Sequence, residues 1–333
     1  MRAFYRLLTE LTSRRTLSRL AGALAKSGFS RRLIPHFVKV YAIRADEAEK
    51  PIGEYASLNE FFTRRLKAGA RTPDAGERTL ISPVDAVVTA FGPVREGTRM
   101  TVKGQEYTVE ELLNRSPRTV NYRQGAYIVL YLSPSDYHRI HAPVGGRIVE
   151  TELIPGTVYP VNDFGLRHVR NVLSRNVRRV TYIRHAWGET AVVKIGALNV
   201  ASIRYVDPLP EEVRKGEELA TFEFGSTVVV LTESGTFRFR PGLNVGDRVR
   251  MGEPLGELHP RESPVADPSP NAEQGRSEPG DPDAGRRADR GAGQTDRGVE
   301  QANHGAGQAD RGAGQTDHDA GRVDRDKNDD HKP

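Results

Sequence analysis

The sequence predicts an α+β protein: one β-rich domain over residues 45–261, amphipathic helices before it at 1–44, and a disordered tail after it at 262–333. Three observations lead to this division. Helix signals are confined to the first quarter of the chain. After Arg71 the apolar residues fall in short runs bounded by glycine, proline and aspartate, which is typical of strands. From Glu262 onward the chain contains no Leu, Ile, Phe, Tyr, Trp or Met.

The first 44 residues are strongly basic, with ten Lys and Arg and a single acid, Glu10. Apolar residues recur there at helical spacing: Phe4, Leu7, Leu8, Leu11, Leu17, Leu20 and Leu24. A basic amphipathic helix can lie in an anionic membrane interface with its apolar face down. The same pattern also fits a helix that packs on its own domain, or a basic patch for nucleic acid. The pattern alone leaves these alternatives open.

Several classes of protein are disfavoured by what the chain lacks. No run approaches the roughly 18 uncharged apolar residues of a membrane span. The N-terminus shows no compact apolar region with a small-residue cleavage site, as a secretory signal would. The chain has no cysteine, so it has no disulfide framework, no cysteine metal site and no thiol nucleophile. We expect a cytoplasmic protein that touches a membrane face.

The middle of the chain predicts strands with two short helices. A helix is expected over 57–66, because Ser57 is a good N-cap residue and Glu60 follows three residues later. A second short helix is expected at 109–116. The predicted strand segments are 80–92, 126–132, 146–154, 178–185, 190–206 and 222–231, followed by a turn–strand–turn–strand unit at 242–258.

Within the last 72 residues a seven-residue repeat runs from 290 to 324, as in RGAGQTD at 290–296 and again at 311–317. No position of this heptad is consistently apolar, so the repeat is not a coiled coil. Such a segment cannot bury enough apolar surface to offset its ordering entropy, and we expect it to be disordered. The tail carries a net charge of −6, which leaves +11 on residues 1–261.

Three places in the sequence could carry chemistry: Asp85 in an apolar strand entry, the pair His138 and His141 after the strand at 126–132, and Gly225-Ser226 inside the run 222–231. Taken singly, each has a structural explanation: a turn acid, packed histidines and a bulge serine. Taken together they form an acid, a base and a nucleophile, the parts of a relay whose order along the chain is free. The serine lacks the G-x-S-x-G elbow of hydrolases.

A strand serine that directly follows glycine favours attack on its own backbone. If His141 takes the Ser226 hydroxyl proton, the alkoxide can attack the Gly225 carbonyl carbon and shift the acyl group from nitrogen to oxygen. Glycine tolerates a strained backbone and leaves the approach open. Elimination of the ester and hydrolysis then leave a pyruvoyl group at the new N-terminus. Asp85 would orient His141 and stabilise its imidazolium form.

At this point the residues resemble those of the phosphatidylserine decarboxylases, over about residues 45–260. The motifs are SLNEFFTRRLKAGAR, SPVDAVV, VKGQEYTVEELL, YLSPSDYHRIHAPVGG, PGTVYPVN, SRNVRRV, IGALNVASI and KGEELATFEFGSTVVVL. Ala86, Ala201 and Ala220 depart from glycines that are common in the family. Of these, Ala86 adjoins Asp85.

The resemblance implies specific roles for these positions. Asp85, His141 and Ser226 would form the self-processing relay, which cleaves between Gly225 and Ser226 into a β chain of 1–225 and an α chain of 226–333. Ser226 would become the covalent pyruvoyl cofactor, whose ketone forms a Schiff base with the serine amine of the lipid. His138 would aid decarboxylation by protonating the product carbanion.

The resemblance also implies partners and a location. The substrate would be phosphatidylserine in an anionic membrane, and the product phosphatidylethanolamine. The α and β chains of one precursor would stay together as a heterodimer, no nucleic acid is expected, and homo-oligomerisation is left open. The protein would be peripheral on the cytoplasmic face of the cell membrane, held there by residues 1–44. We expect the PGTVYPVN loop to contact the lipid phosphate.

Two rival interpretations were weighed against this one. His138, His141 and Asp85 resemble a small zinc site for peptide hydrolysis, but no third histidine is well placed and the Gly225-Ser226 pair stays unexplained. The segment 242–258 resembles the hairpin of lipoyl-type carrier domains, but the lysine expected at its tip is missing. Neither rival accounts for all three places, so the sequence favours the decarboxylase.

Overall fold

The computed structural model describes residues 22–161, 166, 169–197, 203–223 and 226–261. The predicted helix before residue 22, the heptad-repeat tail from 262 and Gly225 lie outside the described residues.

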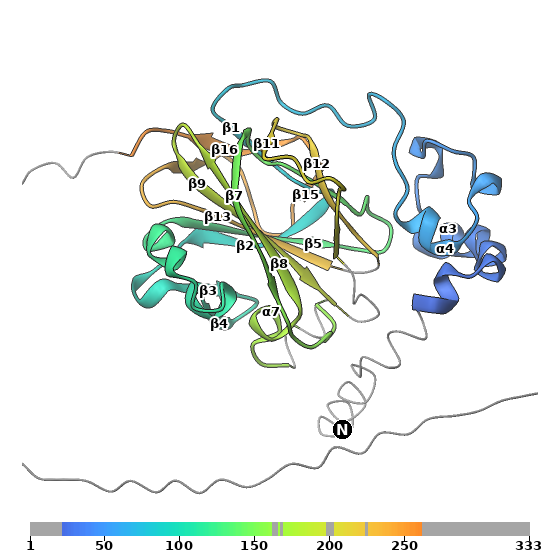
Figure 1. Cartoon of the computed structure of the whole chain (residues 1–333), viewed down its shortest axis with the longest axis horizontal. Coiled ribbons are helices and arrows are strands. Elements are labelled where there is room, and N and C mark those ends of the chain that lie inside the picture. Colours follow the sequence, from blue (N-terminus) through green and yellow to red (C-terminus); the bar gives the residue numbers. More distant parts are fainter. Residues whose placement is uncertain (1–21, 162–165, 167–168, 198–202, 224–225, 262–333) are drawn as a thin grey trace, which may run out of the picture. The chain divides into compact units, whose positions relative to one another are not determined.

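The described chain is rich in strands, which confirms the predicted α+β, β-rich class (Figure 1). The helices and 3₁₀ turns are η1 (Gly28–Leu33), α3 (Ile34–Tyr41), η2 (Ala45–Glu47), η3 (Ile52–Glu54), α4 (Leu58–Phe62), η4 (Glu96–Thr98), α5 (Val109–Leu112), η5 (Pro117–Tyr122) and α7 (Val172–Arg175). The strands are β1 (Thr79–Ile81), β2 (Ala86–Pro93), β3 (Arg99–Val102), β4 (Gln105–Thr108), β5 (Ala126–Leu132), β6 (Arg139–His141), β7 (Gly146–Ile154), β8 (Arg178–His185), β9 (Gly188–Gly196), β10 (Ile203–Tyr205), β11 (Glu212–Val213), β12 (Glu218–Phe222), β13 (Ser226–Thr232), β14 (Phe237–Phe239), β15 (Arg248–Val249) and β16 (Pro254–Leu258).

The centre of the fold is an eight-stranded antiparallel sheet in the order β11-β7-β8-β9-β13-β5-β2-β15. Two three-stranded sheets, β10-β12-β6 and β1-β16-β14, and the hairpin β3-β4 complete it. In the central sheet β13 is paired along all seven of its residues, with β5 on one side and β9 on the other. A chain that begins at Ser226 therefore starts with a strand in the middle of the sheet.

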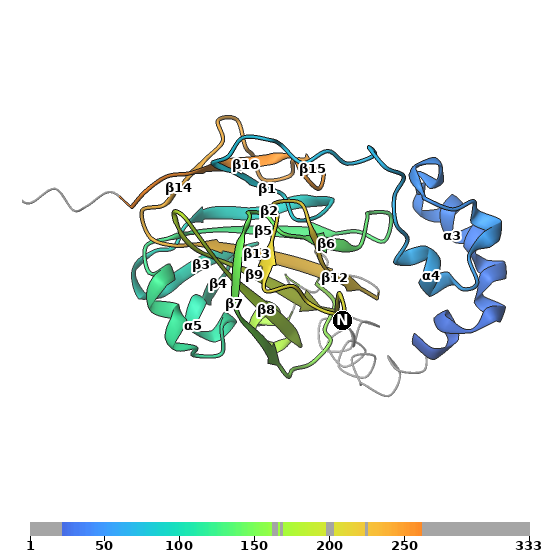
Figure 2. The same ribbon diagram turned by 45° about the horizontal axis from the view of Figure 1, so that its top comes forward.

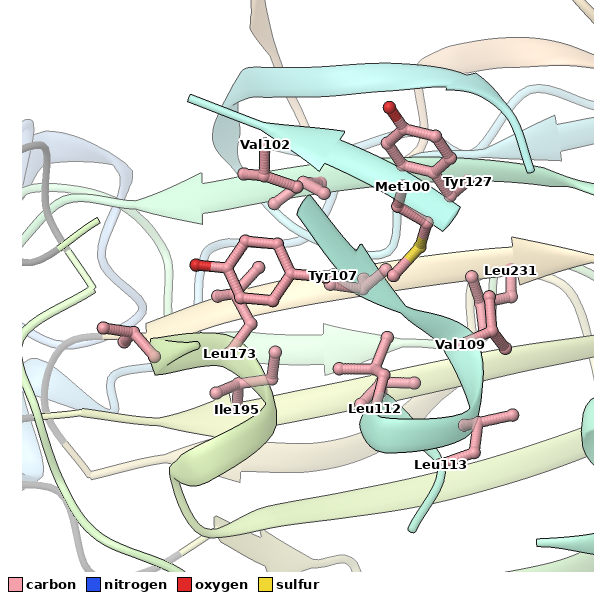
Figure 3. Close-up of a cluster of buried hydrophobic side chains, with 14 of the residues drawn as sticks. Met100, Val102, Tyr107, Val109, Leu112, Leu113, Tyr127, Leu173, Ile195 and Leu231 are labelled. Atoms are coloured by element: carbon pink, nitrogen blue, oxygen red, sulfur yellow. The ribbon is translucent and has the colours of Figure 1, made fainter. Parts of the chain in front are cut away.

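In the middle of this sheet both faces are buried, because alternate residues of β5, β9 and β13 enter two different cores. Ile195 and Leu231 join the core under α5, α7 and the β3–β4 hairpin (Figure 3), to which Val129 also belongs. Leu130 and Val228, on the opposite face, pack in the second core with residues of the two smaller sheets. Burial on both faces explains why 126–132 and 228–231 are continuous apolar runs.

The run 222–231, predicted as one strand, is two strands in two different sheets. β12 ends at Phe222 in the β10-β12-β6 sheet, and β13 begins at Ser226 in the central sheet. The predicted single strand is therefore corrected to two strands that belong to different sheets. The predicted cleavage point lies directly before the start of β13.

The helical segment beside the sheet has a small core of its own, built on Ile34, Ile43 and Phe61 with neighbouring apolar residues (Figure 2). The predicted cap of α4 is confirmed: the Ser57 hydroxyl accepts a hydrogen bond from the Glu60 N–H at 3.1 Å. The helix stops at Phe62 and not at 66. In the described part of the chain, no helix has the length and apolarity that crossing a membrane requires.

Candidate active site

The starts of β13 and β2, which lie at or beside predicted site residues, meet the end of β5 at one end of the central sheet. Ser226, the first residue of β13, pairs with Leu132, the last residue of β5. On the other side of β5, Tyr131 pairs with Val87, two residues after Asp85. Because these neighbours are antiparallel, the starts of β13 and β2 lie beside the end of β5. The fold therefore brings Asp85 and the Ser226 backbone to the same end of the sheet.

The two histidines lie near the same end of the sheet, His141 at the end of β6 and His138 in the turn before it. The Phe222 N–H donates to the His138 carbonyl at 2.9 Å, and the His141 N–H donates to the Pro83 carbonyl at 2.9 Å. Since Ser226 follows Phe222 by four residues, its Cα lies within about 14 Å of that Phe222 contact. The fold thus gathers both histidines, Asp85 and the Ser226 backbone into one region.

His138 is fully buried, and only one of its two ring nitrogens has a hydrogen-bond partner among the described residues. Its Nδ1 lies 2.9 Å from the Asp136 carbonyl, so Nδ1 carries the proton and donates it. Its Nε2 has no hydrogen-bond partner among the residues described. Burial, with a further contribution from the positive charge of Arg64, lowers the pKa of His138 to about 3. His138 is therefore a neutral imidazole with a free acceptor nitrogen.

His141, by contrast, has both ring nitrogens occupied. Nδ1 lies 2.8 Å from the Gly216 carbonyl and donates to it, and the Tyr137 hydroxyl lies 3.0 Å from Nε2 and donates to that nitrogen. Burial lowers the pKa of His141 and raises that of Tyr137. The basic nitrogen of His141 is thus Nε2, and a tyrosine covers it.

Asp85 is held by an arginine and not by a histidine. Its carboxylate accepts hydrogen bonds from Arg71, with Nε at 2.8 Å, and from the Met251 N–H at 2.8 Å. Arg71 also pairs with Glu47 at 2.9 Å. Burial opposes the charge of Arg71, but the two carboxylates outweigh it and raise the pKa of the guanidinium. No hydrogen bond joins Asp85 to His141, so the predicted orienting contact is absent from this arrangement.

Three residues of this site were not singled out by the sequence: Arg71, Tyr137 and Arg64. Each lies inside a motif that carried the family resemblance, so the signal was present but gave no role. Tyr137 directly precedes His138, and Arg71 closes the motif SLNEFFTRRLKAGAR. The roles of these two residues come from contacts that the motifs do not show: Tyr137 with His141, four positions away, and Arg71 with Asp85, 14 positions away.

The arrangement suits proton transfer near the start of β13. It offers one imidazole nitrogen free to accept a proton, a second imidazole behind a tyrosine, and a carboxylate fixed by a cation. It does not suit the rival zinc site: across the described ranges, no group of three His, Cys, Asp or Glu residues could hold a metal ion. The Asp85 oxygens are already used by Arg71 and the Met251 N–H.

Comparison with known proteins defines the class first. The chain is 43% identical over 260 residues to a phosphatidylserine decarboxylase proenzyme of Geobacillus kaustophilus, covering 77% of this chain and 98% of that relative. It is 40% identical over 254 residues to the proenzymes of the same name from Bacillus thuringiensis subsp. konkukian and Bacillus mycoides, covering 76% of this chain and 97% of each. The protein is a decarboxylase of the proenzyme type.

The family model for phosphatidylserine decarboxylase matches residues 58–257. The chain belongs to the phosphatidylserine decarboxylase family, as the sequence motifs predicted. The match begins at the start of α4 and ends within β16, so it spans every residue of the candidate site.

Proposed function

We propose that this chain is a self-processing proenzyme that converts phosphatidylserine to phosphatidylethanolamine and CO2 after cleaving itself between Gly225 and Ser226. Its relatives are named phosphatidylserine decarboxylase proenzymes. The observation that carries the proposal is the placement of Ser226: it is the first residue of β13, four positions after the last residue of β12. His138, whose Nε2 has no partner among the described residues, accepts a hydrogen bond from the Phe222 N–H with its carbonyl at that end of β12.

In the cleavage step, the Ser226 oxygen bonds to the Gly225 carbonyl carbon and the peptide C–N bond breaks, giving an ester. Loss of the Ser226 α-proton expels the Gly225 carboxylate, and water then replaces the nitrogen, which leaves as ammonia. His141 is our candidate base for the hydroxyl proton, acting through Nε2. Because Tyr137 occupies that nitrogen at 3.0 Å, the tyrosine must turn away or pass the proton on.

After cleavage the two chains, 1–225 and 226–333, stay together as a heterodimer. The first strand of the α chain, β13, is hydrogen-bonded along both edges to strands of the β chain. Its side chains Val228, Val229 and Val230 are fully buried. Burial of each such side chain contributes roughly 1.5–3 kcal/mol, so breaking one peptide bond at the strand's start does not release the strand.

The site fits a pyruvoyl group formed from Ser226. Such a group supplies a ketone carbonyl that takes up the electron pair left when CO2 departs. The unpartnered Nε2 of His138 is the buried polar atom that needs a partner in the loaded site. As a neutral imidazole, His138 must first accept a proton, which the ammonium group of the substrate can give. It then returns that proton to the carbon that has lost CO2.

Docking to an anionic membrane surface is supported by the helical segment. Of nine exposed large apolar side chains among the described residues, five lie between residues 24 and 41: Leu24, Phe29, Leu33, Val40 and Tyr41. Arg31, Arg32 and Lys39 are exposed on the same segment. Apolar side chains ringed by cations are the composition of an interfacial membrane anchor. We propose the cytoplasmic face of the cell membrane as its location.

The test is a decarboxylation assay on purified protein with vesicles that contain phosphatidylserine. The processed protein should release CO2 and leave phosphatidylethanolamine, and Ser226→Ala should do neither. Processed wild-type protein that releases no CO2 from these vesicles would contradict the proposed substrate.

A further inference from the structure

Arg64 is a buried cation with three of its five N–H donors unused. The residue is 4% exposed, and its Nη2 lies 3.2 Å from the Ser135 carbonyl and 3.5 Å from that of Asp136. Its Nε and Nη1 have no partner among the described residues. Its Cζ also lies 5.1 Å from the Phe61 ring centroid, a cation–π contact.

A guanidinium in this state needs an anion. Burial lowers the pKa of Arg64, which reflects the cost of holding its charge away from water. Buried charges are normally paired, and unsatisfied buried donors cost free energy. The carboxylates in its electrostatic surroundings, Asp85 and Glu47, are both bonded to Arg71 instead. An anion brought by a ligand would complete the site.

Arg64 contacts both the turn that precedes His138, through the Asp136 carbonyl, and the core of the helical segment, through the Phe61 ring. It shares the Asp136 carbonyl with His138, whose Nδ1 is 2.9 Å from that oxygen. Aromatic contacts continue outward: Phe62 stacks on His138 at 3.9 Å between centroids, and Phe37 contacts Phe62 at 6.3 Å. Phe37 also contacts Tyr41, which is 43% exposed, at 4.7 Å.

We propose that Arg64 binds the phosphodiester of the lipid substrate through Nε or Nη1, an inference that rests on the proposed function. The N–H groups of these two nitrogens point to different sides of the guanidinium, so a phosphate oxygen accepts a charge-assisted hydrogen bond from one of them. The phosphodiester of a serine phospholipid lies between the serine group and the acyl chains. Arg64 likewise contacts the turn before His138 and, through Phe61, the core of the helical segment proposed to meet the membrane.

The substrate carboxylate is the less suitable ligand for Arg64. A cation paired with that carboxylate would stabilise the substrate more than the transition state, in which the charge leaves the carboxylate, and would slow the reaction. The phosphodiester keeps its charge throughout. Within the PGTVYPVN loop, expected from the sequence to contact phosphate, the Thr157 hydroxyl is bonded to Asn176 and the Tyr159 hydroxyl accepts from Arg175. The described polar side chains of that loop are therefore already engaged.

The experiment compares Arg64→Gln and Arg64→Lys with Arg65→Gln in processed enzyme. Arg65 is the adjacent, exposed arginine and serves as the matched control. The probe is glycerophosphoethanolamine, which has the phosphodiester but no carboxylate and no acyl chains, and its Kd is measured by calorimetry. KM and kcat are measured with a soluble short-chain phosphatidylserine.

We expect Arg64→Gln to raise both the Kd of the probe and the KM by about 10- to 100-fold, the range for a lost charge-assisted hydrogen bond. The kcat should stay within about threefold, because uniform binding is what is lost. Arg64→Lys should lie between, and Arg65→Gln should match the wild type. An unchanged Kd in Arg64→Gln, or a lower kcat at unchanged KM, overturns the proposal.

A crystal structure of the processed wild-type enzyme with glycerophosphoethanolamine covers the case in which the variants do not fold. The phosphate should lie at about 3 Å from Nε or Nη1 of Arg64, and phosphate bound elsewhere in the site overturns the proposal. Failure of the proposed function has a different signature, namely a wild-type protein that stays uncleaved or releases no CO2.

Discussion

The protonation state of His138 predicts how the stability of the protein depends on pH. The buried ring has a pKa of about 3 in the folded protein, against an ordinary value of 6.5. Between these values the unfolded chain binds a proton that the folded protein does not. The free energy of unfolding is therefore highest above pH 6.5, as far as His138 determines it, and it decreases progressively as the pH falls toward 3.

The size of this decrease in the free energy of unfolding follows from the difference between the two pKa values. Each pH unit inside the window costs about 1.4 kcal/mol, so lowering the pH from 7 to 5 should remove about 2 kcal/mol of unfolding free energy through His138 alone. Since the ring is 0% exposed, solvent screening does not reduce this figure. Burial also lowers the pKa values of His141 and His185, so the free energy of unfolding of the wild-type protein should decrease still more steeply as the pH falls.

The assay is urea unfolding of the uncleaved Ser226→Ala protein, with and without His138→Gln, at both pH values. The His138→Gln protein should lose about 2 kcal/mol less than its parent between pH 7 and pH 5. His36→Gln, which changes an exposed histidine of α3, is the control and should keep the parent's dependence. If His138→Gln also keeps that dependence, His138 is not held neutral, and its role as an initial proton acceptor is refuted.

Three further predictions concern other contacts of the site and the proposed membrane anchor. Arg71→Met leaves the buried Asp85 carboxylate without its cation and leaves Glu47 with Arg44 alone, so it should cost about 3–5 kcal/mol in urea unfolding and slow self-cleavage. Arg44→Met, which removes the half-exposed second partner of Glu47, should change stability by less than about 0.5 kcal/mol, and equal losses in the two variants would refute a special role for Arg71. Tyr137→Phe should lower stability by about 1–3 kcal/mol while the chain still cleaves, because Nε2 of His141 is uncovered; an uncleaved but folded chain would instead place the Tyr137 hydroxyl in the proton path. Val40→Ser should weaken binding to anionic vesicles while Val245→Ser, at 57% exposure against 59%, should not, and equal binding by the two variants would contradict docking through α3.

Much of the strand pattern could be predicted because burial leaves a local signature. The segments 126–132, 146–154 and 178–185 are the strands β5, β7 and β8 with the same bounds. The run 222–231 misled the prediction because apolar residues lie both at the end of β12 and within β13, so the sequence does not mark where one strand stops and the next begins. Which sheet each half joins depends on partners far away in the sequence, β6 for one and β5 with β9 for the other.

The candidate site was predictable in its members but not in its connections. Motifs pointed to Asp85, His138 and His141, and the fold gathers them. The pairing of Asp85 with Arg71, 14 positions away, and of His141 with the Gly216 carbonyl, 75 positions away, depends on the folded backbone. The same holds for the free nitrogen of His138, because its tautomer is set by the Asp136 carbonyl.

The most direct test of the central claim is the intact mass of the purified wild-type protein beside Ser226→Ala. Self-processing predicts two wild-type chains that separate after Gly225, with a hydroxylamine-reactive carbonyl at the start of the chain that begins at Ser226, and a single full-length chain for Ser226→Ala. A folded wild-type protein that remains one chain of unaltered mass would contradict self-processing at this junction.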